Sequence, residues 1–252
     1  MKTKEIRIQK IIADCGLASR RKAEQMIIEK KVKINGRIAV LGDKADPYND
    51  KIFVSGKRVT ANAKPSAVYI MLNKPRGYIT TMSDEKGRRC VAELVKDAGA
   101  RVFPVGRLDK DSEGLLLLTN DGEFANAVSH PGHQQYKVYR VTVRKPGKGG
   151  QLLPFERGEL ENMAEAFATG MDLGEYKTQP AELRVITREE TRAVLEVLLR
   201  EGKNRQIRNM CESLGLEVAR LKRTAVGTVK LGMLKSGKWR RLTPEEVHKL
   251  EG

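Results

Sequence analysis

The sequence predicts an α+β protein with two domains, a small N-terminal helix–helix–strand domain and a larger domain with a mixed, mainly antiparallel sheet and flanking helices. Three observations support this. Residues 5–29 carry apolar side chains at helical spacing and are followed by short strands around turns. Residues 60–66 have no periodicity and include Pro65, as expected of a linker. The rest of the chain alternates strand-like and helical segments, and 252 residues suffice for both domains.

The first helix is predicted over residues 5–15, because Ile8, Ile11, Ile12 and Cys15 recur at helical spacing and Gly16 follows. Ser19 is a typical N-cap for a second helix that extends to about residue 29. Its inward face is expected to consist of Ala23, Met26 and Ile27.

Three consecutive cations, Arg20, Arg21 and Lys22, occupy the first turn of this second helix. Positive charge at a helix N-terminus opposes the helix dipole, which suggests that these side chains serve an external anion. The alternative is that they are ordinary solvated surface charges.

Short strands follow the two helices. Lys33-Ile34-Asn35-Gly36-Arg37 is typical of a hairpin with an Asn-Gly type I′ turn, and residues 51–57 indicate another strand and turn. This order, with Ala18–Ala23, Val32–Gly36 and Asp50–Ile52, resembles the small RNA-binding domain first known from small-subunit ribosomal protein four. We therefore expect an RNA-binding domain at residues 1–60, with Lys33 among its RNA contacts, a linker at 61–66 and a second domain at 67–252.

Residues 105–122 are the centre of the larger domain. A polar segment with Asp109, Asp111 and Glu113 precedes Leu115–Leu118, and Asn120-Asp121-Gly122 forms a second turn. A short apolar run bounded by turns is typical of a strand buried on both faces. The polar segment should therefore lie at one rim of a sheet, where a site could form.

The same stretch resembles a family signature. Gly106-Arg107-Leu108-Asp109, continued through Ser112-Glu113-Gly114 and Leu115–Leu118 to Gly122, is similar to the RsuA/RluB family of ribosomal-RNA pseudouridine synthases. The resemblance implies that Asp109 is the catalytic aspartate. It also implies that Arg107 holds the backbone of a flipped nucleotide.

Two further motifs follow in the order that the family has. Residues 136–143 alternate as a strand that places Lys137, Tyr139, Val141 and Val143 on one face. On pattern alone Tyr139 would be a core residue, but the resemblance of Lys137-x-Tyr139 to the family implies that Tyr139 packs against the target base. Gln206-Ile207-Arg208 resembles the third motif, which implies that Arg208 pairs with Asp109.

Additional cations are expected to bind RNA. Asn73-Lys74-Pro75-Arg76-Gly77 resembles the family's first motif, and its two cations could contact phosphate, although a structural turn is an equal alternative. The other expected RNA contacts in the larger domain are Arg107, Lys203 and Arg205.

Composition favours a nucleic-acid partner. The chain has 48 Lys and Arg against 32 Asp and Glu, a net charge of +16, and such an excess attracts polyanions. Residues 1–60 alone have 15 basic and 7 acidic residues, so half of the net charge is concentrated there. A basic protein without a nucleic-acid partner is the alternative.

Other classes of protein are disfavoured by what the sequence contains. Cys15, Cys90 and Cys211 are odd in number and widely spaced, which argues against disulfides and a zinc site. We expect no metal, no cofactor, no membrane segment and no signal peptide, and hence a cytoplasmic protein. A monomer is expected, since no heptad pattern is present.

The sequence thus predicts site-specific formation of pseudouridine in ribosomal RNA, or in a ribosomal assembly intermediate. Large-subunit RNA is preferred, because the length and the basic C-terminus resemble the RluB branch; the same reaction on small-subunit RNA is the alternative. Two other classes stay open: a glycoside hydrolase using Asp109 with Asp111 or Glu113, and a non-catalytic ribosome-associated RNA-binding protein. Asp109 could attack ribose C1′ or stabilise an oxocarbenium-like sugar, and sequence does not choose between these routes.

Overall fold

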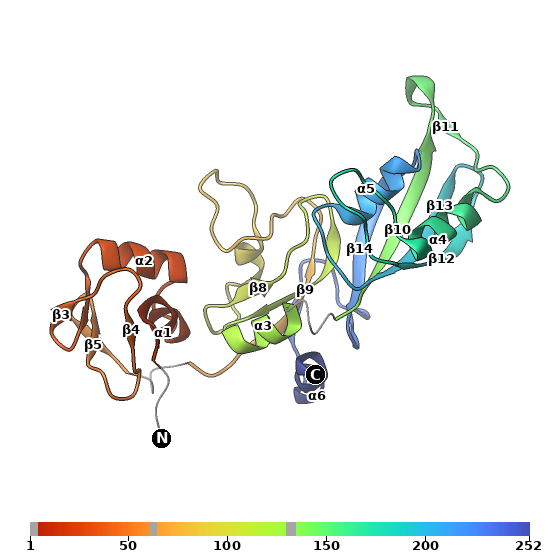
Figure 1. Cartoon of the computed structure of the whole chain (residues 1–252). Coiled ribbons are helices and arrows are strands. Elements are labelled where there is room, and N and C mark those ends of the chain that lie inside the picture. The colour runs from red at the N-terminus through yellow and green to blue at the C-terminus, as the bar shows by residue number, and fades with distance from the viewer. Residues whose placement is uncertain (1–4, 61–64, 130–134) are drawn as a thin grey trace. The chain divides into compact units, whose positions relative to one another are not determined.

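The computed structural model describes residues 5–60, 65–129 and 135–252. The chain divides into two compact units (Figure 1). The first contains the described residues up to Val68, together with Asp97–Val102 and Asn120–Gly122, and the second contains the remainder. Four of the six residues predicted as a linker, 61–64, lie outside the described part of the chain.

The first unit begins with two short helices. Strand β1 (Ile6–Arg7) pairs with β4 (Lys44–Ala45), and α1 (Ile8–Asp14) and α2 (Arg20–Ile28) follow β1. The first helix therefore starts at Ile8 rather than at residue 5, because the two preceding residues are used in strand pairing. Ser19 caps α2 as predicted, since its side chain accepts a hydrogen bond from the Lys22 amide.

A four-stranded sheet completes this unit, in the order β3-β2-β5-β6. The predicted hairpin joins β2 (Val32–Ile34) to β3 (Arg37–Ile38), and a second joins β5 (Ile52–Val54) to β6 (Lys57–Val59). Asn35 and Gly36 both have positive φ, as a type I′ turn requires. The inner sides of the helices and strands share one core, which includes Ile8, Ile12, Ala23, Val32 and Ile52.

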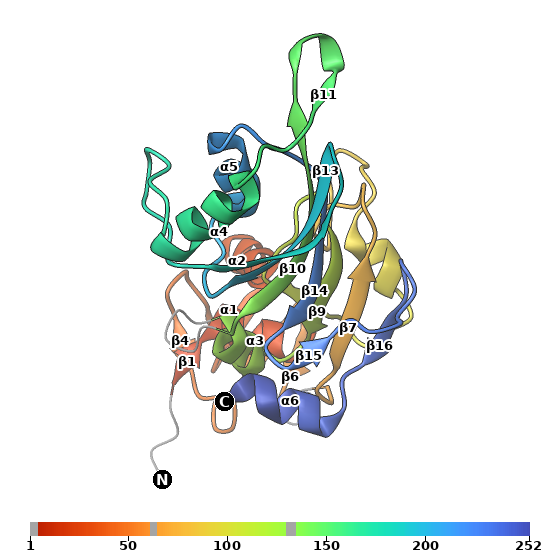
Figure 2. The ribbon, with the colours of Figure 1, turned by 90° about the vertical axis from the view of Figure 1, so that its right-hand side faces the viewer.

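The second unit is built on a long sheet, and Figure 2 shows most of its strands side by side. The order is β12-β13-β10-β14-β9-β7-β16, and all neighbours are antiparallel except β14 and β9. The mixed, mainly antiparallel sheet predicted from sequence is thus confirmed. Its strands are β7 (Tyr69–Lys74), β9 (Glu113–Thr119), β10 (Lys137–Pro146), β12 (Glu182–Arg188), β13 (Arg192–Leu199), β14 (Glu217–Val226) and β16 (Trp239–Arg241).

Three short strands and several helices flank this sheet. Strand β8 (Phe103–Val105) pairs with β9, β11 (Leu152–Leu153) with β10, and β15 (Val229–Lys230) with β14. The helices are α3 (Gly122–Ser129), α4 (Glu159–Thr169), α5 (Gln206–Ser213) and α6 (Pro244–Glu251), with a 3₁₀ helix at Val91–Val95. Helix α4 and strand β11 lie between β10 and β12 in the chain.

The central strand β9 is buried on both faces, as predicted, since Leu115–Leu118 are at most 2 % exposed. Leu115 and Leu117 belong to a core cluster that includes Phe124 from α3 and Leu250 from α6. Along one edge β9 pairs first with β14, at Glu113 and Gly114, and then with β8 from Leu117 onward. The two halves of the sheet therefore separate beside β9.

One predicted position differs in part from the structure. Cys15 was expected on an apolar helix face; it is the C-cap of α1, where it is partly buried and packs against the core. The helix therefore ends one residue earlier than the periodicity indicated. Helix α5 ends before Leu214, which is its C-cap residue and remains exposed. Cys15, Cys90 and Cys211 are not joined in disulfide bonds.

Candidate active site

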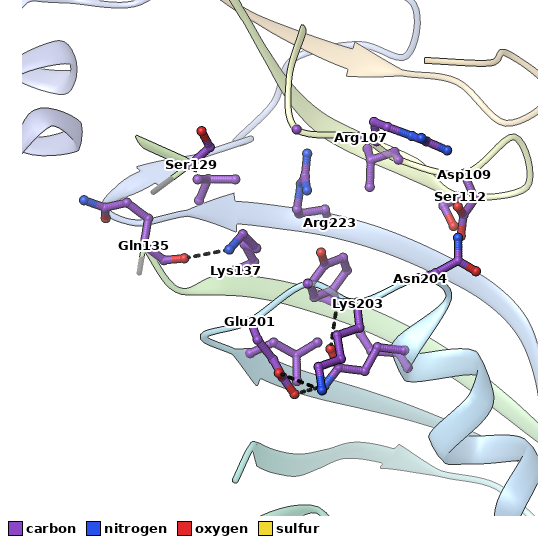
Figure 3. A pocket seen from close by; sticks show the side chains of 18 of the residues that line it. Arg107, Asp109, Ser112, Ser129, Gln135, Lys137, Glu201, Lys203, Asn204 and Arg223 are labelled. Carbon is purple, nitrogen blue, oxygen red and sulfur yellow. Dashed lines mark hydrogen bonds and ion pairs between the residues drawn. The ribbon is translucent and has the colours of Figure 1, made fainter. Parts of the chain in front are cut away.

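A pocket of about 600 Å³ lies in the second unit where β9 and β14 separate (Figure 3). Val105–Asp109, Ser112 and Leu117 of β9 line one side. Strands β10 and β14 and residues 199–207 line the other side. The predicted catalytic loop therefore does open into a cavity, at the start of a buried strand.

Asp109 lines this pocket from the loop between β8 and β9. Its backbone carbonyl accepts hydrogen bonds from the Ser112 amide at 3.1 Å and from Lys74 Nζ at 2.9 Å, which fold the loop into a tight turn. Within the described part of the chain, no residue donates a hydrogen bond to the Asp109 carboxylate. The carboxylate is thus available to a ligand in the pocket.

Lys74 is completely buried at the end of β7, directly beneath this loop. Its ammonium group donates to the carbonyls of Pro75 at 3.2 Å, Asp109 at 2.9 Å and Ser112 at 2.7 Å. The prediction that Lys74 contacts RNA phosphate is therefore wrong, because all three donors of the ammonium are used inside the protein. Lys74 holds the loop, and the alternative of a structural turn is the one found.

Tyr139 is 8 % exposed and lines the opposite side of the pocket. It lies near the start of β10, which runs between two strands, and is opposite Val197 of β13 and Arg223 of β14. Neighbours directly across a sheet share a face, so Arg223 and Tyr139 both project into the cavity. An aromatic ring fixed in this way can support a planar ligand.

Arg208 does not pair with Asp109, contrary to the prediction. Its guanidinium lies 3.3 Å from the Asp111 carboxylate and donates to the carbonyls of Asp111 at 3.2 Å and Val218 at 3.0 Å. Arg208 comes from helix α5 and is not among the residues that line the pocket, although burial, which lowers its pKa, is still opposed by the charge of Asp109, which raises it. It therefore holds the loop two residues beyond Asp109.

Asp111 receives a second cation, Arg205, at 3.4 Å. Partial burial raises the pKa of the Asp111 carboxyl, but the charges of Arg208 and Arg205 outweigh it and lower the pKa below its usual value. Asp111 is consequently ionised and engaged. Glu113 is likewise ion-paired, with Arg220.

The remaining side chains predicted to contact RNA differ in whether they are exposed or already engaged by other protein groups. Arg107 is exposed at the mouth of the pocket, and Arg76 is exposed in the turn after β7. Lys203 is engaged: its ammonium lies 3.8 Å from the centre of the Tyr176 ring and donates to the Lys177 carbonyl. In the first unit the predicted cations are all exposed, namely Arg20, Arg21, Lys22 and Lys33.

Sequence reasoning missed Arg223 as a site residue and gave Lys137 no role beyond the face it shares with Tyr139. Both line the pocket, and the side chain of Arg223 is held by a 2.7 Å hydrogen bond from Nε to the Leu115 carbonyl. Alternation along residues 217–226 would have shown that Arg223 shares a face with the apolar Leu221. The sequence signal that could have identified Arg223 as a site residue was therefore a cation at an inward-facing strand position.

The described residues show neither a cluster of metal ligands nor a membrane-spanning helix. In residues 5–60, 65–129 and 135–252, no three His, Cys, Asp or Glu side chains are grouped so as to hold a metal ion. No helix in the same ranges is long and apolar enough to cross a membrane.

Comparisons with known proteins agree with this architecture. Residues 68–213 match the family model described as RNA pseudouridylate synthase, and residues 6–47 match that of the S4 domain. The chain is 41 % identical to "Ribosomal large subunit pseudouridine synthase B" of Bacillus subtilis, over 97 % of this chain and 95 % of the relative. It is 36 % identical to "Dual-specificity RNA pseudouridine synthase RluF" of Escherichia coli, over 96 % of this chain and 77 % of the relative. A crystal structure of a pseudouridylate synthase superposes with a TM-score of 0.66 at 30 % identity, covering 97 % of this chain and 99 % of that one.

Proposed function

This chain belongs to the RNA pseudouridylate synthase family, and on that premise we propose that it converts a specific uridine in ribosomal RNA to pseudouridine, with Asp109 as the nucleophile. The observation that carries this proposal is the Asp109 carboxylate, unpaired among the described residues, in a 600 Å³ pocket opposite Tyr139. A pocket of this size accepts a nucleoside-sized ligand.

The reaction breaks the bond between uracil N1 and ribose C1′, turns the base, and joins uracil C5 to C1′. The Asp109 carboxylate either attacks C1′ or stabilises an oxocarbenium-like sugar. The target base must first leave its stack to reach the pocket, which costs a few kcal/mol. Tyr139 would then pack against the uracil, and the exposed Arg107 at the pocket mouth would contact the backbone of the flipped nucleotide.

Lys74 and Arg208 would act as positioning residues for this chemistry. Lys74 fixes the Asp109 and Ser112 carbonyls from below, and Arg208 fixes Asp111 from the side of α5. A catalytic group must be held to within a fraction of an ångström for an efficient attack. Two buried or half-buried cations on backbone carbonyls supply such support.

RNA binding would be shared between two domains. Residues 1–60 would grip RNA through the S4 domain and its exposed cations at the start of α2, and residues 67–252 would form the catalytic domain. Arg76, Arg205 and Lys203 would add phosphate contacts near the pocket. Lys203 and Arg205 would exchange or share their present partners when RNA binds.

Large-subunit ribosomal RNA is the proposed substrate. The name of the Bacillus subtilis relative, which is similar over nearly the full length, supports this choice. Action on small-subunit RNA is the alternative.

Two rival functions are less consistent with the site. A glycoside hydrolase would need a second free carboxylate, but Asp111 pairs with arginines and Glu113 pairs with Arg220. A non-catalytic RNA-binding protein would leave the pocket and its unpaired carboxylate without a role.

The experiment that tests the proposal is tritium release from ribosomal RNA transcripts labelled at uracil C5. Wild-type protein and Asp109→Asn are compared on large- and small-subunit RNA separately. We expect release from large-subunit RNA by wild-type protein only, because the C5–H bond is replaced when C5 joins C1′. Release by Asp109→Asn at the wild-type rate would exclude Asp109 as the nucleophile, and free uracil among the products would favour the hydrolase.

A further inference from the structure

Two cations line the pocket from adjacent strands, the partly buried Lys137 on β10 and the buried Arg223 on β14 (Figure 3). Arg223 lies directly across from Tyr139, and Lys137 precedes Tyr139 by two residues on the same face of β10. The two positive charges are close enough for Arg223 to lower the pKa of Lys137. They form a pair that we call the inner cation pair.

The inner cation pair has no anionic partner in the described part of the chain. Arg223 is 5 % exposed and its Nε donates to the Leu115 carbonyl, while both terminal guanidinium nitrogens lack a described partner. Lys137 donates to the Gln135 carbonyl at 3.1 Å and to no carboxylate. Burial lowers the pKa of Lys137, and the charge of Arg223 lowers it further.

Such an arrangement is costly for the free protein. Burying a charge without a counter-ion is unfavourable, and placing two like charges together adds to this penalty. Nearby surface cations avoid it, since Arg220 pairs with Glu113 and Arg205 with Asp111. The uncompensated positive charge therefore indicates an anionic group that enters the pocket.

The burial of Arg223 indicates which negative charge it would meet, that of the backbone phosphate or that of the departing base. A phosphate remains on the solvent-exposed backbone, and the exposed Arg107 at the pocket mouth suits it. The inner cation pair instead lies on the face of the sheet that carries Tyr139, where the proposed function places the uracil. Its ligand is thus the base rather than the phosphate.

We propose that Lys137 and Arg223 form an anion subsite that stabilises the uracil anion released when the glycosidic bond breaks, an inference that rests on the proposed function. In this step the C1′–N1 bond breaks and its electron pair passes to N1, while C1′ becomes bonded to or stabilised by the Asp109 carboxylate. The negative charge spreads from N1 onto the O2 and O4 carbonyl oxygens, and no proton is transferred. Fixed cations aimed at a developing charge are an effective form of catalysis.

The test compares Lys137→Met and Arg223→Met with Arg140→Met as a matched control. Arg140 is an exposed cation on β10 next to Tyr139 and is not among the residues that line the pocket. We expect each inner variant to lose about 100-fold in kcat for tritium release, the magnitude typical for removal of one such group. The Kd for RNA and its salt dependence should match those of wild type, and Arg140→Met should keep the wild-type kcat.

A second substrate separates charge stabilisation from a merely structural role. Fluorine at C5 withdraws electrons and stabilises the uracil anion, so the loss should be smaller when RNA containing 5-fluorouridine at the target is used. Consumption of 5-fluorouridine is followed by nuclease digestion and chromatography. An equal loss on both substrates would overturn the proposal.

Other outcomes of these measurements also test the proposal. Weaker RNA binding with a reduced salt dependence and unchanged kcat would assign the inner cation pair to phosphate and overturn the proposal. If Arg223→Met does not fold, Lys137→Met, which leaves the Leu115 hydrogen bond intact, carries the test alone. Wild-type kcat in Lys137→Met would then overturn the inference while leaving the proposed function standing, whereas inactive wild-type protein would refute the proposed function itself.

Discussion

At the scale of single residues, the same side-chain type takes opposite roles in this chain. Lys74 lies in a basic turn of the sequence, yet it is among the largest fully buried side chains of the described residues. Burial is tolerated because three carbonyls surround the ammonium. Arg208 similarly exchanges its predicted carboxylate partner for Asp111 and two carbonyls. Charged residues that look like ligand contacts thus support the loop that carries Asp109.

Lys74→Met should lower the free energy of unfolding by about 2–3 kcal/mol, because the substitution leaves buried carbonyls without donors. Burial lowers the pKa of Lys74 from 10.5 to about 8, although Asp109 and other carboxylates oppose this shift. Above pH 8 the unfolded chain therefore binds more protons than the folded one at this site, so the contribution of Lys74 to stability rises with pH up to about 10.5.

The measurement is urea denaturation of wild type, Lys74→Met and the control Lys110→Met at several pH values. Lys110 is an exposed lysine of the same loop, so its variant should differ little from wild type. The difference in unfolding free energy between wild type and Lys74→Met should be constant below pH 8 and increase between pH 8 and 10.5. A difference that stays level across this range would show that Lys74 is not titrating as described.

At the scale of secondary-structure elements, the site depends on one short parallel contact. Strands β9 and β14 pair only at Glu113–Lys222 and Gly114–Arg223 before they diverge to form the pocket. Gly114 has a φ of +104°, and a Cβ atom there would lie 2.2 Å from the Arg223 carbonyl oxygen. Only glycine allows the two backbones to approach this closely.

Gly114→Ala should therefore destabilise the protein by about 3 kcal/mol or more, from the backbone clash and the positive φ together. Gly202→Ala is the control, because a Cβ at Gly202 meets nothing within 4 Å and its φ is not positive. Its effect should stay within about 0.5 kcal/mol. Thermal or urea unfolding measures both, and a Gly114→Ala protein as stable as the control would refute the close approach of the two strands.

At the scale of the whole molecule, positive charge is the dominant property. Half of the net charge of +16 belongs to residues 1–60, where the predicted RNA-binding cations are exposed. Replacing Arg20, Arg21 and Lys22 with Ala should weaken RNA binding and reduce the slope of log K against log salt by about 2–3, because fewer counterions are released.

The measurement is filter binding to a ribosomal RNA fragment over a range of salt concentrations. The control replaces three exposed cations of the second unit, Lys148, Arg157 and Arg184, which removes the same charge. We expect the control to change the slope less than the first triple variant does. Equal slopes for both triple variants would mean that the α2 cations add only to the overall charge of the protein and do not contact RNA phosphates directly.

The sequence by itself was sufficient for the elements whose signals are local. Helix α2 was predicted from its Ser19 cap, the β2–β3 hairpin from Asn35-Gly36, and the buried strand β9 from its leucine run. These signals depend on neighbours a few residues apart, so they can be recognised without the fold. The residues proposed for chemistry, Asp109 and Tyr139, were selected by motif resemblance, and the structure places both in one pocket.

Only the tertiary structure decided how side chains far apart in sequence combine. Arg208 and Asp111 are 97 positions apart, Lys74 and Ser112 are 38 apart, and Arg223 and Leu115 are 108 apart. Whether a cation meets a carboxylate, a carbonyl or an open pocket depends on strand order and on where β9 and β14 diverge. The type of residue determines what charge is present, and the packing of distant strands determines which partner that charge finds.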